Sequence, residues 1–151
     1  DLLDIDYFKQ YNDTYGHQDG DKALISVATA LKNALERPRD LVFRLGGEEF
    51  GLIFEAKTSD VAEAFAETVK DNIEALKIPH QHNSASPYVT VSMGLVFIPP
   101  VCDLSVDYYY KVADDMLYRA KDAGRNKIQM KSLVRALKVN QVEEVGVSQK
   151  S

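Results

Sequence analysis

The adjacent glycines Gly46 and Gly47 restrict the fold of this chain more than any other feature of its sequence. They separate two apolar runs, Leu41–Leu45 and Glu49–Glu55. Glycine adopts the positive φ of a tight turn without steric cost, and apolar runs on both sides of such a pair are typical of a β-hairpin. The sequence therefore predicts two antiparallel strands joined within "RLGGEEF", residues 44–50.

Amphipathic helices and short apolar strands alternate along the rest of the chain. The expected elements, in order, are a strand at Asp1–Asp6, a helix at Lys22–Glu36, the two hairpin strands, a helix from Asp60, a strand at Tyr88–Phe97, a helix at Asp107–Ala123 and a strand at Lys127–Met130. The helix from Asp60 is expected to place Val61, Phe65, Val69 and Leu76 on or near one side. The segment Tyr7–Asp21, rich in Asn, Asp and Gly, is expected to be a loop with no more than a short turn of helix. The order βαββαβαβ predicts an α+β fold, an α/β sandwich in which helices pack on a mixed sheet.

Length and composition are those of a single globular domain. The chain has 151 residues, of which 45% are hydrophobic and 27% are charged, and this balance is typical of a protein with one core. The predicted domain spans residues 1–130. Residues 131–151 are polar with scattered valines, and we expect a tail that forms one short helix at most and is then disordered.

Charge and cysteine content argue against several classes of protein. A net charge of −5 argues against a protein that binds the phosphate backbone of nucleic acids, which normally presents a basic face. The single cysteine, Cys102, excludes an internal disulfide and indicates a reducing compartment, so we expect a cytoplasmic location. No apolar run approaches the roughly 20 residues that span a bilayer, so we expect no membrane segment in this chain.

Carboxylates are expected to converge at one edge of the predicted sheet. Neighbouring strands lie about 4.8 Å apart, so pairing of the first strand with the hairpin would place Asp4 beside Glu48. Two carboxylates that close repel each other unless a cation lies between them, and oxygen ligands suit Mg²⁺ or Mn²⁺. The two glycines of the turn leave room for a bulky anion. This pattern favours a metal and phosphate site, and an ordinary Gly-Gly hairpin with solvated glutamates is the alternative.

A second polar group lies far away in the sequence. Lys121 and Arg125, within "AKDAGRNK", are four residues apart near a predicted helix end and can share one side of it. They are candidate phosphate contacts, and the alternative is that cations favour a helix C-terminus because of the helix dipole. Lys9 is a third candidate, with an ordinary surface lysine as its alternative.

Four sequence blocks occur in order, "DIDYFKQYNDTYGHQDGD" at 4–21, "RLGGEEF" at 44–50, "VTVSMG" at 89–94 and "ADDMLYRAKDAGRNK" at 113–127. With these blocks the chain resembles the GGDEF domain of the diguanylate cyclases, a family of bacterial signalling enzymes, over roughly residues 1–130. The resemblance implies a central mixed five-stranded sheet flanked by helices, related to nucleotide cyclases and polymerase palms. It also implies a reaction in which two GTP condense to cyclic di-GMP and release two pyrophosphates.

The resemblance further implies roles for the acidic residues. Asp4, Glu48 and the backbone carbonyl of Ile5 would bind Mg²⁺ or Mn²⁺. Either Glu48 or Glu49 would help to deprotonate the attacking 3′-hydroxyl group. The third motif position, Glu48, is Glu rather than Asp, a variant that the family accepts in active members, so the resemblance favours an active enzyme.

Substrate contacts are implied in the same way. Lys121 and Arg125 would act in catalysis by holding phosphates, and Asn12 and Asp21 would read guanine. The full set of implied substrate contacts is Lys9, Asn12, Asp21, Gly46, Gly47, Lys121 and Arg125.

The segment "RPRD", Arg37–Asp40, adds a regulatory expectation. Its arginine lies 11 positions before Glu48, as in the family's Arg-x-x-Asp site for product inhibition. Arginine can fork onto a guanine edge or a phosphate, and aspartate can accept hydrogen bonds from guanine. The resemblance therefore implies that Arg37 and Asp40 bind cyclic di-GMP, and the alternative is a charged loop between a helix and a strand.

The product also sets an expectation for assembly. One domain offers one nucleotide site, whereas cyclic di-GMP is made from two GTP. Two domains must therefore face each other across a two-fold axis, and we expect catalysis to require a homodimer. The family's segment before the first strand and an N-terminal sensor or dimerising domain, with any membrane tether, are expected ahead of Asp1.

Two other classes of function stay open. A catalytically inactive GGDEF domain would bind GTP or cyclic di-GMP as a receptor only, although the presence of Asp4, Glu48 and Glu49 argues against it. A related nucleotidyltransferase would use the same kind of site to make a different dinucleotide or a cyclic nucleotide.

Overall fold

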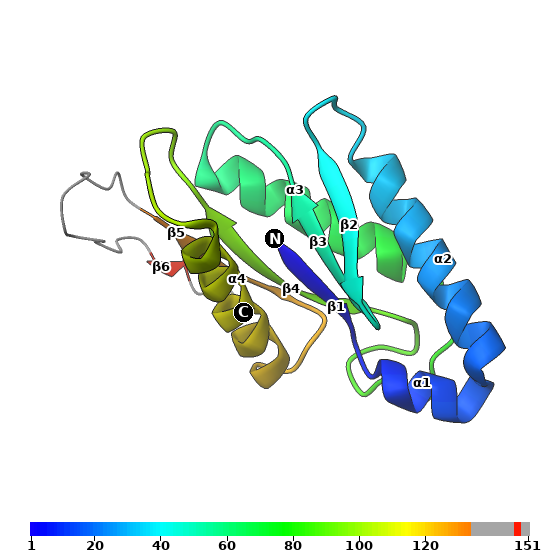
Figure 1. Ribbon diagram of the computed structural model, residues 1–151. Helices are drawn as coiled ribbons and strands as arrows, with labels where there is room; N and C mark the ends of the chain where they lie inside the picture. The colour runs from blue at the N-terminus through cyan, green and yellow to red at the C-terminus, as the bar shows by residue number, and fades with distance from the viewer. Residues whose placement is uncertain (134–146, 149–151) are drawn as a thin grey trace.

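The computed structural model describes residues 1–133 and 147–148 of the chain. A mixed β-sheet lies at its centre, with the strand order β2-β3-β1-β4-β5-β6 (Figure 1). Strands β4 and β5 are parallel, and every other neighbouring pair is antiparallel. The strands are β1 Leu2–Ile5, β2 Leu41–Gly46, β3 Glu49–Ile53, β4 Val91–Phe97, β5 Ile128–Ser132 and β6 Val147–Ser148. The helices are α1 Phe8–Tyr15, α2 His17–Ala34, α3 Ser59–Glu74 and α4 Val106–Asp122.

The predicted fold class is confirmed, because β1 to β5 form a mixed five-stranded sheet with helices packed on it. The predicted order βαββαβαβ is wrong in one place, since two helices follow β1 and the order is βααββαβαβ, with β6 added at the edge. Strand β5 ends at Ser132, two residues past the predicted domain boundary, and β6 pairs with it. The helix and the disorder predicted for the tail fall on residues 134–146 and 149–151, which lie outside the described part of the chain.

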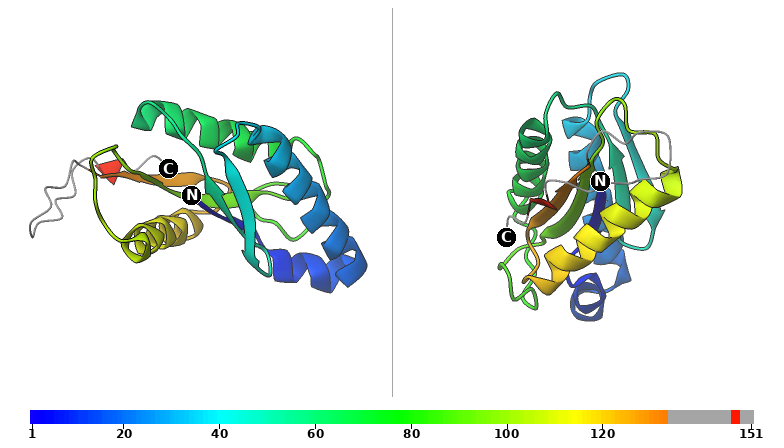
Figure 2. Two further views of the ribbon diagram at one scale, coloured as in Figure 1. Left: turned by 45° about the horizontal axis from the view of Figure 1, so that its top comes forward. Right: turned by 90° about the vertical axis from the view of Figure 1, so that its left-hand side faces the viewer.

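Helices cover the two faces of the sheet (Figure 2). Helices α2 and α3 lie on one face, over the larger core, and α4 lies on the other face against β1, β4 and β5. The most deeply buried side chains of the larger core, each no more than 1% exposed, include Leu3, Leu31, Leu52, Val69 and Met93. Burial of this apolar area removes it from water and stabilises the sheet that positions the site described below.

Strand β4 is buried on both sides. Its sequence alternates apolar residues with Ser92 and Gly94, yet all residues from 91 to 95 are buried because helices cover both faces. A Cβ added at Gly94 would lie 2.2 Å from both the Ala113 oxygen and the Leu117 nitrogen of α4. The glycine therefore allows the backbone of α4 to lie directly on the strand, and it fixes the distance between the helix and the sheet.

The prediction of a loop at residues 7–21 is wrong. Helix α1 occupies Phe8–Tyr15, and α2 begins at His17 rather than at Lys22. Phe8 and Tyr11, three residues apart, bury one side of α1, and Gly16, at a φ of 89°, separates the two helices. The abundance of Asn and Asp in this segment concealed a helix whose apolar side is narrow.

The inward face of α3 is also different from the prediction. Val61 and Leu76 are 53% and 42% exposed, and they do not belong to the core. The buried residues of the helix are Ala62, Glu63, Ala66, Val69 and Ile73. Small alanines allow the helix to approach the sheet closely, so the contact face follows alanine positions that a count of large apolar residues overlooks.

The β2–β3 hairpin is less covered than the rest of the sheet. Leu41 and Ile53 face each other in the register, and Phe43 and Leu45 follow on the same side of β2. These four apolar side chains are between 41% and 54% exposed. Among the described residues, no helix lies over this apolar side of the hairpin, which is beside the region that α4 covers (Figure 1).

Candidate active site

Strand β1 brings Asp4 and the hairpin turn together at one end of the sheet. It lies between β3 and β4, and Asp4 is opposite Glu49 in the β1–β3 register. The Ile5 N–H group donates to the Glu48 carbonyl oxygen at 3.2 Å. The fold therefore places these four residues side by side, as pairing of the first strand with the hairpin required.

Asp4 is a buried acid with too little positive charge around it. It is 8% exposed, and burial raises its pKa to about 6. The Nζ of Lys121 donates to Asp4 Oδ2 and opposes that shift, whereas the carboxylates of Glu48 and Glu49 add to it. Lys121 alone does not offset the cost of the buried carboxylate, so a divalent cation at this position would be favourable.

The oxygen atoms at this edge match part of a magnesium shell. Within residues 1–133, no three His, Cys, Asp or Glu side chains are placed to hold a metal by themselves. Mg²⁺ usually takes one or two protein carboxylates and completes its shell with water and substrate phosphates. Asp4 and Glu48, with the Ile5 carbonyl nearby in the chain, are hard oxygen donors of that kind. The residues fit a divalent cation that is bound together with a phosphate.

The glycines of the turn leave an open backbone surface. Gly46 has a φ of 148° and Gly47 a φ of 50°, values that residues with side chains rarely adopt. A Cβ at either position would have no neighbouring atom within 4 Å among the described residues. The Arg44 guanidinium donates to the Gly47 carbonyl oxygen at 2.9 and 2.6 Å and braces the turn. The sequence motif contains this arginine, but only the structure shows what it does.

Two cationic side chains approach the same end of β1 from α4. Lys121 lies in the last turn of the helix and pairs with Asp4. Arg125 follows the helix at a φ of 65°, and its guanidinium lies 4.5 Å from the centre of the Tyr7 ring. Tyr7 lies two residues after the end of β1. The two cations therefore lie beside Asp4 and just beyond the end of the strand.

The predicted guanine contacts lie where α1 meets α2. Asn12 Oδ1 is buried and has no hydrogen-bond partner among the described residues. The Asn12 side chain lies against Gly20, where a Cβ would be only 1.7 Å from Asn12 Oδ1. Asp21, the next residue, is exposed, and so is Lys9 one turn before Asn12. The exposed Asp21 carboxylate fits a ligand that offers hydrogen-bond donors, whereas Asn12 Oδ1 is packed against Gly20.

Residues 2–127 match the family model described as "Diguanylate cyclase, GGDEF domain". The chain belongs to the GGDEF domain family. It is 37% identical to the probable diguanylate cyclase DgcT of Escherichia coli K12 over 133 residues, which are 88% of this chain and 29% of DgcT. It is 41% identical to the diguanylate cyclase DgcM of the same strain over 127 residues, which are 84% of this chain and 29% of DgcM.

A solved structure agrees with this GGDEF assignment. The GGDEF domain of DgcB from Caulobacter crescentus, in complex with c-di-GMP, matches with a TM-score of 0.72 and 30% identity, over 87% of this chain and 74% of that one. The present GGDEF domain spans less than a third of the length of the two curated E. coli relatives. In the part of the chain that the structure describes, no helix is long and apolar enough to cross a bilayer.

The "RPRD" segment of this GGDEF domain lies away from the Asp4 site. Asp40 directly precedes β2, whereas the glycine turn is at the other end of that strand. The Arg37 side chain pairs with Asp40 at 3.3 Å and donates to the Glu55 carbonyl oxygen at 2.7 Å. Together with Pro38 and Arg39 these residues line a recess of about 270 Å³. The predicted product-binding pair is thus a local, structured unit at the surface.

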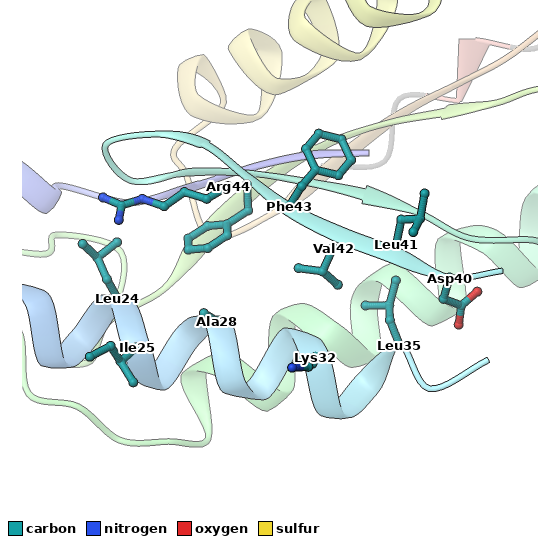
Figure 3. A pocket seen from close by; sticks show the side chains of 11 residues that line it. Leu24, Ile25, Ala28, Lys32, Leu35, Asp40, Leu41, Val42, Phe43 and Arg44 are labelled. Carbon is teal, nitrogen blue, oxygen red and sulfur yellow. The ribbon is translucent and has the colours of Figure 1, made fainter. Parts of the chain in front are cut away.

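A groove of about 520 Å³ runs along β2 from Asp40 to Arg44 and was not predicted from the sequence. Figure 3 shows it between α2 and β2, with Arg44 toward one end and Asp40 toward the other. Apolar side chains line most of it, among them Leu24, Ala28 and Val42. No short motif indicates this groove, because its two walls come from separate elements.

Asp6 is the main residue of the site region that the sequence left without a role. It is 2% exposed, and its carboxylate accepts hydrogen bonds from Ser92 Oγ at 2.6 Å, Thr90 Oγ1 at 2.8 Å and the Asn126 N–H group at 3.0 Å. Burial raises the pKa of Asp6, and these hydrogen bonds oppose the shift. Asp6 therefore ties the end of β1 to β4 and to the turn that carries Arg125.

Proposed function

We propose that this GGDEF domain condenses two GTP molecules into cyclic di-GMP and releases two pyrophosphates. One observation carries the proposal: the buried Asp4 lies beside the Glu48–Glu49 turn, with Lys121 and Arg125 approaching the same end of β1. Curated relatives named diguanylate cyclases, and a related domain solved with c-di-GMP, support the same chemistry. The domain would act in the cytoplasm, where GTP is found.

Asp4, Glu48 and the Ile5 carbonyl would hold Mg²⁺ or Mn²⁺ in this proposal. Bound there, the ion would neutralise phosphate charge and lower the pKa of the attacking 3′-hydroxyl group. Glu48 or Glu49 accepts the hydroxyl proton, and both side chains are half-buried beside Asp4.

The phosphates would be held from two directions. Lys121 and Arg125 supply positive charge from the end of α4. Helix α1 begins after Tyr7 without a side-chain cap, so its first N–H groups are free to bind an anion. Lys9, in the first turn of α1, adds a further cation. The protein's share of the catalysis is therefore positioning and charge stabilisation.

Guanine would be read by Asn12 and Asp21, beside the open backbone of Gly46 and Gly47. An ionised Asp21 only accepts hydrogen bonds, and guanine offers it N1–H and the 2-amino group, both absent from adenine. Sites built on such bonds reject analogues strongly, but Asp21 is exposed here. We therefore expect GTP to be preferred over ATP by a factor on the order of 10² to 10³.

Catalysis would require two copies of the domain, because each copy offers one set of candidate metal and phosphate contacts. A homodimer with facing sites would bring the 3′-hydroxyl of one GTP to the α-phosphate of the other. Product feedback through Arg37 and Asp40 belongs to the same proposal. Their position beyond the far end of β2 would allow cyclic di-GMP to bind without entering the catalytic turn.

Incubation with GTP and Mg²⁺, followed by chromatography of the products, tests the proposal directly. We expect cyclic di-GMP and pyrophosphate, at a rate that rises more steeply than the protein concentration while dimers form. The control is Asp4→Asn, which keeps the shape of the side chain and removes its charge. A different dinucleotide would indicate another nucleotidyltransferase, and binding of cyclic di-GMP without any product would indicate a receptor.

A further inference from the structure

The guanidinium of Arg125 rests on an aromatic ring rather than on an acid. It lies 4.5 Å from the centre of the Tyr7 ring, and its Nη1 is 3.5 Å from Tyr7 Oη. The ion pairs of the described residues do not include Arg125, so no carboxylate there lies within 4.0 Å of its guanidinium. A cation–π contact orients the cation without neutralising it, and the charge of Arg125 stays available to an anion.

Tyr7 is itself fixed by the loop between α3 and β4. Its backbone is in the left-handed region, with a φ of 54°, a conformation that residues with side chains keep only where the surroundings enforce it. His80 Nε2 lies 3.0 Å from the Tyr7 carbonyl oxygen, and Tyr7 Oη lies 2.9 Å from Ser84 Oγ. The ring is therefore held at both its backbone and its hydroxyl end.

The turn that carries Arg125 is held by Asp6, the neighbour of Tyr7. Arg125 and Asn126 both have positive φ, 65° and 48°, and the Asn126 N–H group donates to Asp6 Oδ2 at 3.0 Å. The Arg125 N–H group donates to the Ala120 carbonyl oxygen at 3.0 Å. Asp6 thus holds the backbone of Asn126, and Tyr7 contacts the side chain of Arg125.

We propose that Tyr7 is a positioning residue for phosphate recognition, with its ring aiming the Arg125 guanidinium at the phosphates of the bound nucleotide. This inference rests on the phosphate-binding role that the proposed function gives Arg125. Tyr7 acts on Arg125 and not on the reacting atoms, so it affects binding of the phosphate chain more than turnover. The aromatic ring carries the effect, and the hydroxyl group contributes less, because its contact with Nη1 is at the limit of a hydrogen bond.

Three variants separate these contributions. Tyr7→Leu removes the ring, and Tyr7→Phe keeps it without the hydroxyl. Tyr15→Leu is the matched control, because Tyr15 also contacts the α3–β4 loop, accepting from the Gln81 N–H group at 3.1 Å, but has no contact with Arg125. Calorimetry measures binding of inorganic pyrophosphate with Mg²⁺, and steady-state kinetics measures KM and kcat for GTP.

We expect Tyr7→Leu to weaken pyrophosphate binding about three- to tenfold and to raise the KM for GTP by a similar factor, with kcat changed less than twofold. Tyr7→Phe should stay close to the parent, and Tyr15→Leu should bind pyrophosphate as the parent does. In an Arg125→Ala background, Tyr7→Leu should add nothing, since the two residues act through one contact.

Parent-like pyrophosphate binding by Tyr7→Leu would overturn the inference, as would an equal loss in the Arg125→Ala background. If Tyr7→Leu does not fold, nuclear magnetic resonance of the parent decides the matter. Arg125 side-chain protons assigned by Arg125→Lys should then show the upfield shift of protons above a ring, and an unshifted signal would refute the contact. A parent that binds pyrophosphate but makes no cyclic di-GMP would overturn the proposed function alone.

Discussion

The two sides of the candidate site are held in different ways. On the side of α4, Asp6 is 2% exposed and bonds to Thr90, Ser92 and Asn126, which are 84, 86 and 120 residues away in the sequence. On the hairpin side, the main side-chain support of the glycine turn is Arg44, bonded to a carbonyl only three residues away. The α4 side is therefore held by long-range side-chain bonds, whereas the glycine turn is held by a local side chain and by the backbone pairing of β3 with β1.

This difference indicates which half of the site is ready before a ligand arrives. Long-range bonds between buried groups exist only when the sheet and α4 are assembled, so the α4 side forms together with the core. The turn is exposed, and the apolar face next to it has Phe43 and Leu45 each 41% exposed. We infer that the metal, the nucleotide and the second domain complete the hairpin side.

The largest expected effect is a loss of activity, without a loss of stability, when the hairpin side is changed. Glu48→Gln keeps the size of the side chain but removes the charge that would bind the metal next to Asp4. We expect kcat to fall by at least about 10²- to 10³-fold, while the free energy of unfolding changes by no more than about 0.5 kcal/mol. Product chromatography and circular dichroism check the two parts, and near-parent production of cyclic di-GMP by the folded variant would remove Glu48 from the metal site.

A substitution on the α4 side, at Asp6, should instead reduce the stability of the fold. Asp6→Ala leaves the hydroxyl groups of Thr90 and Ser92 and the Asn126 N–H group without their buried acceptor. We expect the free energy of unfolding to fall by about 3 kcal/mol. Leu45→Ser, at a half-exposed position of the hairpin, is the control and should change it by no more than about 0.5 kcal/mol. Equal losses in urea unfolding would mean that the two sides do not differ as the structure indicates.

A third test asks whether the "RPRD" segment is functional or only a charged loop. Arg37→Ala combined with Asp40→Ala removes two charged partners, so binding of cyclic di-GMP should weaken about tenfold to hundredfold, with an unchanged initial rate. Lys111→Ala is the control, because Lys111 is an exposed cation of α4 that does not line this recess. Calorimetry with cyclic di-GMP decides, and unchanged binding in the double variant would leave only a solvated loop.

The smallest effect concerns pH and the loop that holds Tyr7. Burial lowers the pKa of His80 below its ordinary value of 6.5, and His80 Nδ1 has no partner among the described residues. The unfolded chain therefore binds a proton at His80 more readily than the folded one. Stability should fall as the pH drops below 6.5, until the folded His80 also becomes protonated.

Urea unfolding between pH 7.5 and pH 5.5 measures this slope, which cannot exceed about 1.4 kcal/mol per pH unit for one proton. His80→Gln should reduce the slope in this range, and His82→Gln, at an exposed neighbour, is the control. The same slope in the parent and in His80→Gln would show that groups other than His80 account for the pH dependence.

Local features of the fold were predicted well from the sequence. The Gly46–Gly47 hairpin, the helix expected at Asp107–Ala123 and found at Val106–Asp122, and the strand expected at Lys127–Met130 and found at Ile128–Ser132 were confirmed. Val112, Met116 and Ala120 of the helix are buried as expected. The first helix was missed because its contact side consists of only two buried residues, Phe8 and Tyr11. Pattern counts detect broad apolar faces and miss narrow ones.

The candidate site was predictable to the extent that it lies in short motifs. The expected pairing of the first strand with the hairpin was sufficient to place Asp4 near Glu48. The partners of Asp6 and the contact of Tyr7 with Arg125 were not predictable, because they join residues 84 to 120 positions apart and depend on how α4 crosses the sheet. The roles assigned to Lys9, Asn12 and Asp21 stay predictions.

Gly94 links the spacing between β4 and α4 to the position of the two cations of the candidate site. Because Gly94 has no side chain, the backbone of α4 lies directly against β4 at this position, and no flexible side chain there could adjust to added volume. A methyl group at this position would clash with the backbone of α4 at Ala113 and Leu117 and would push the helix away from the strand. Lys121 and the 125–126 turn would then move away from β1 together. Gly94 therefore controls how closely both cations, Lys121 and Arg125, approach β1, although it has no side chain of its own.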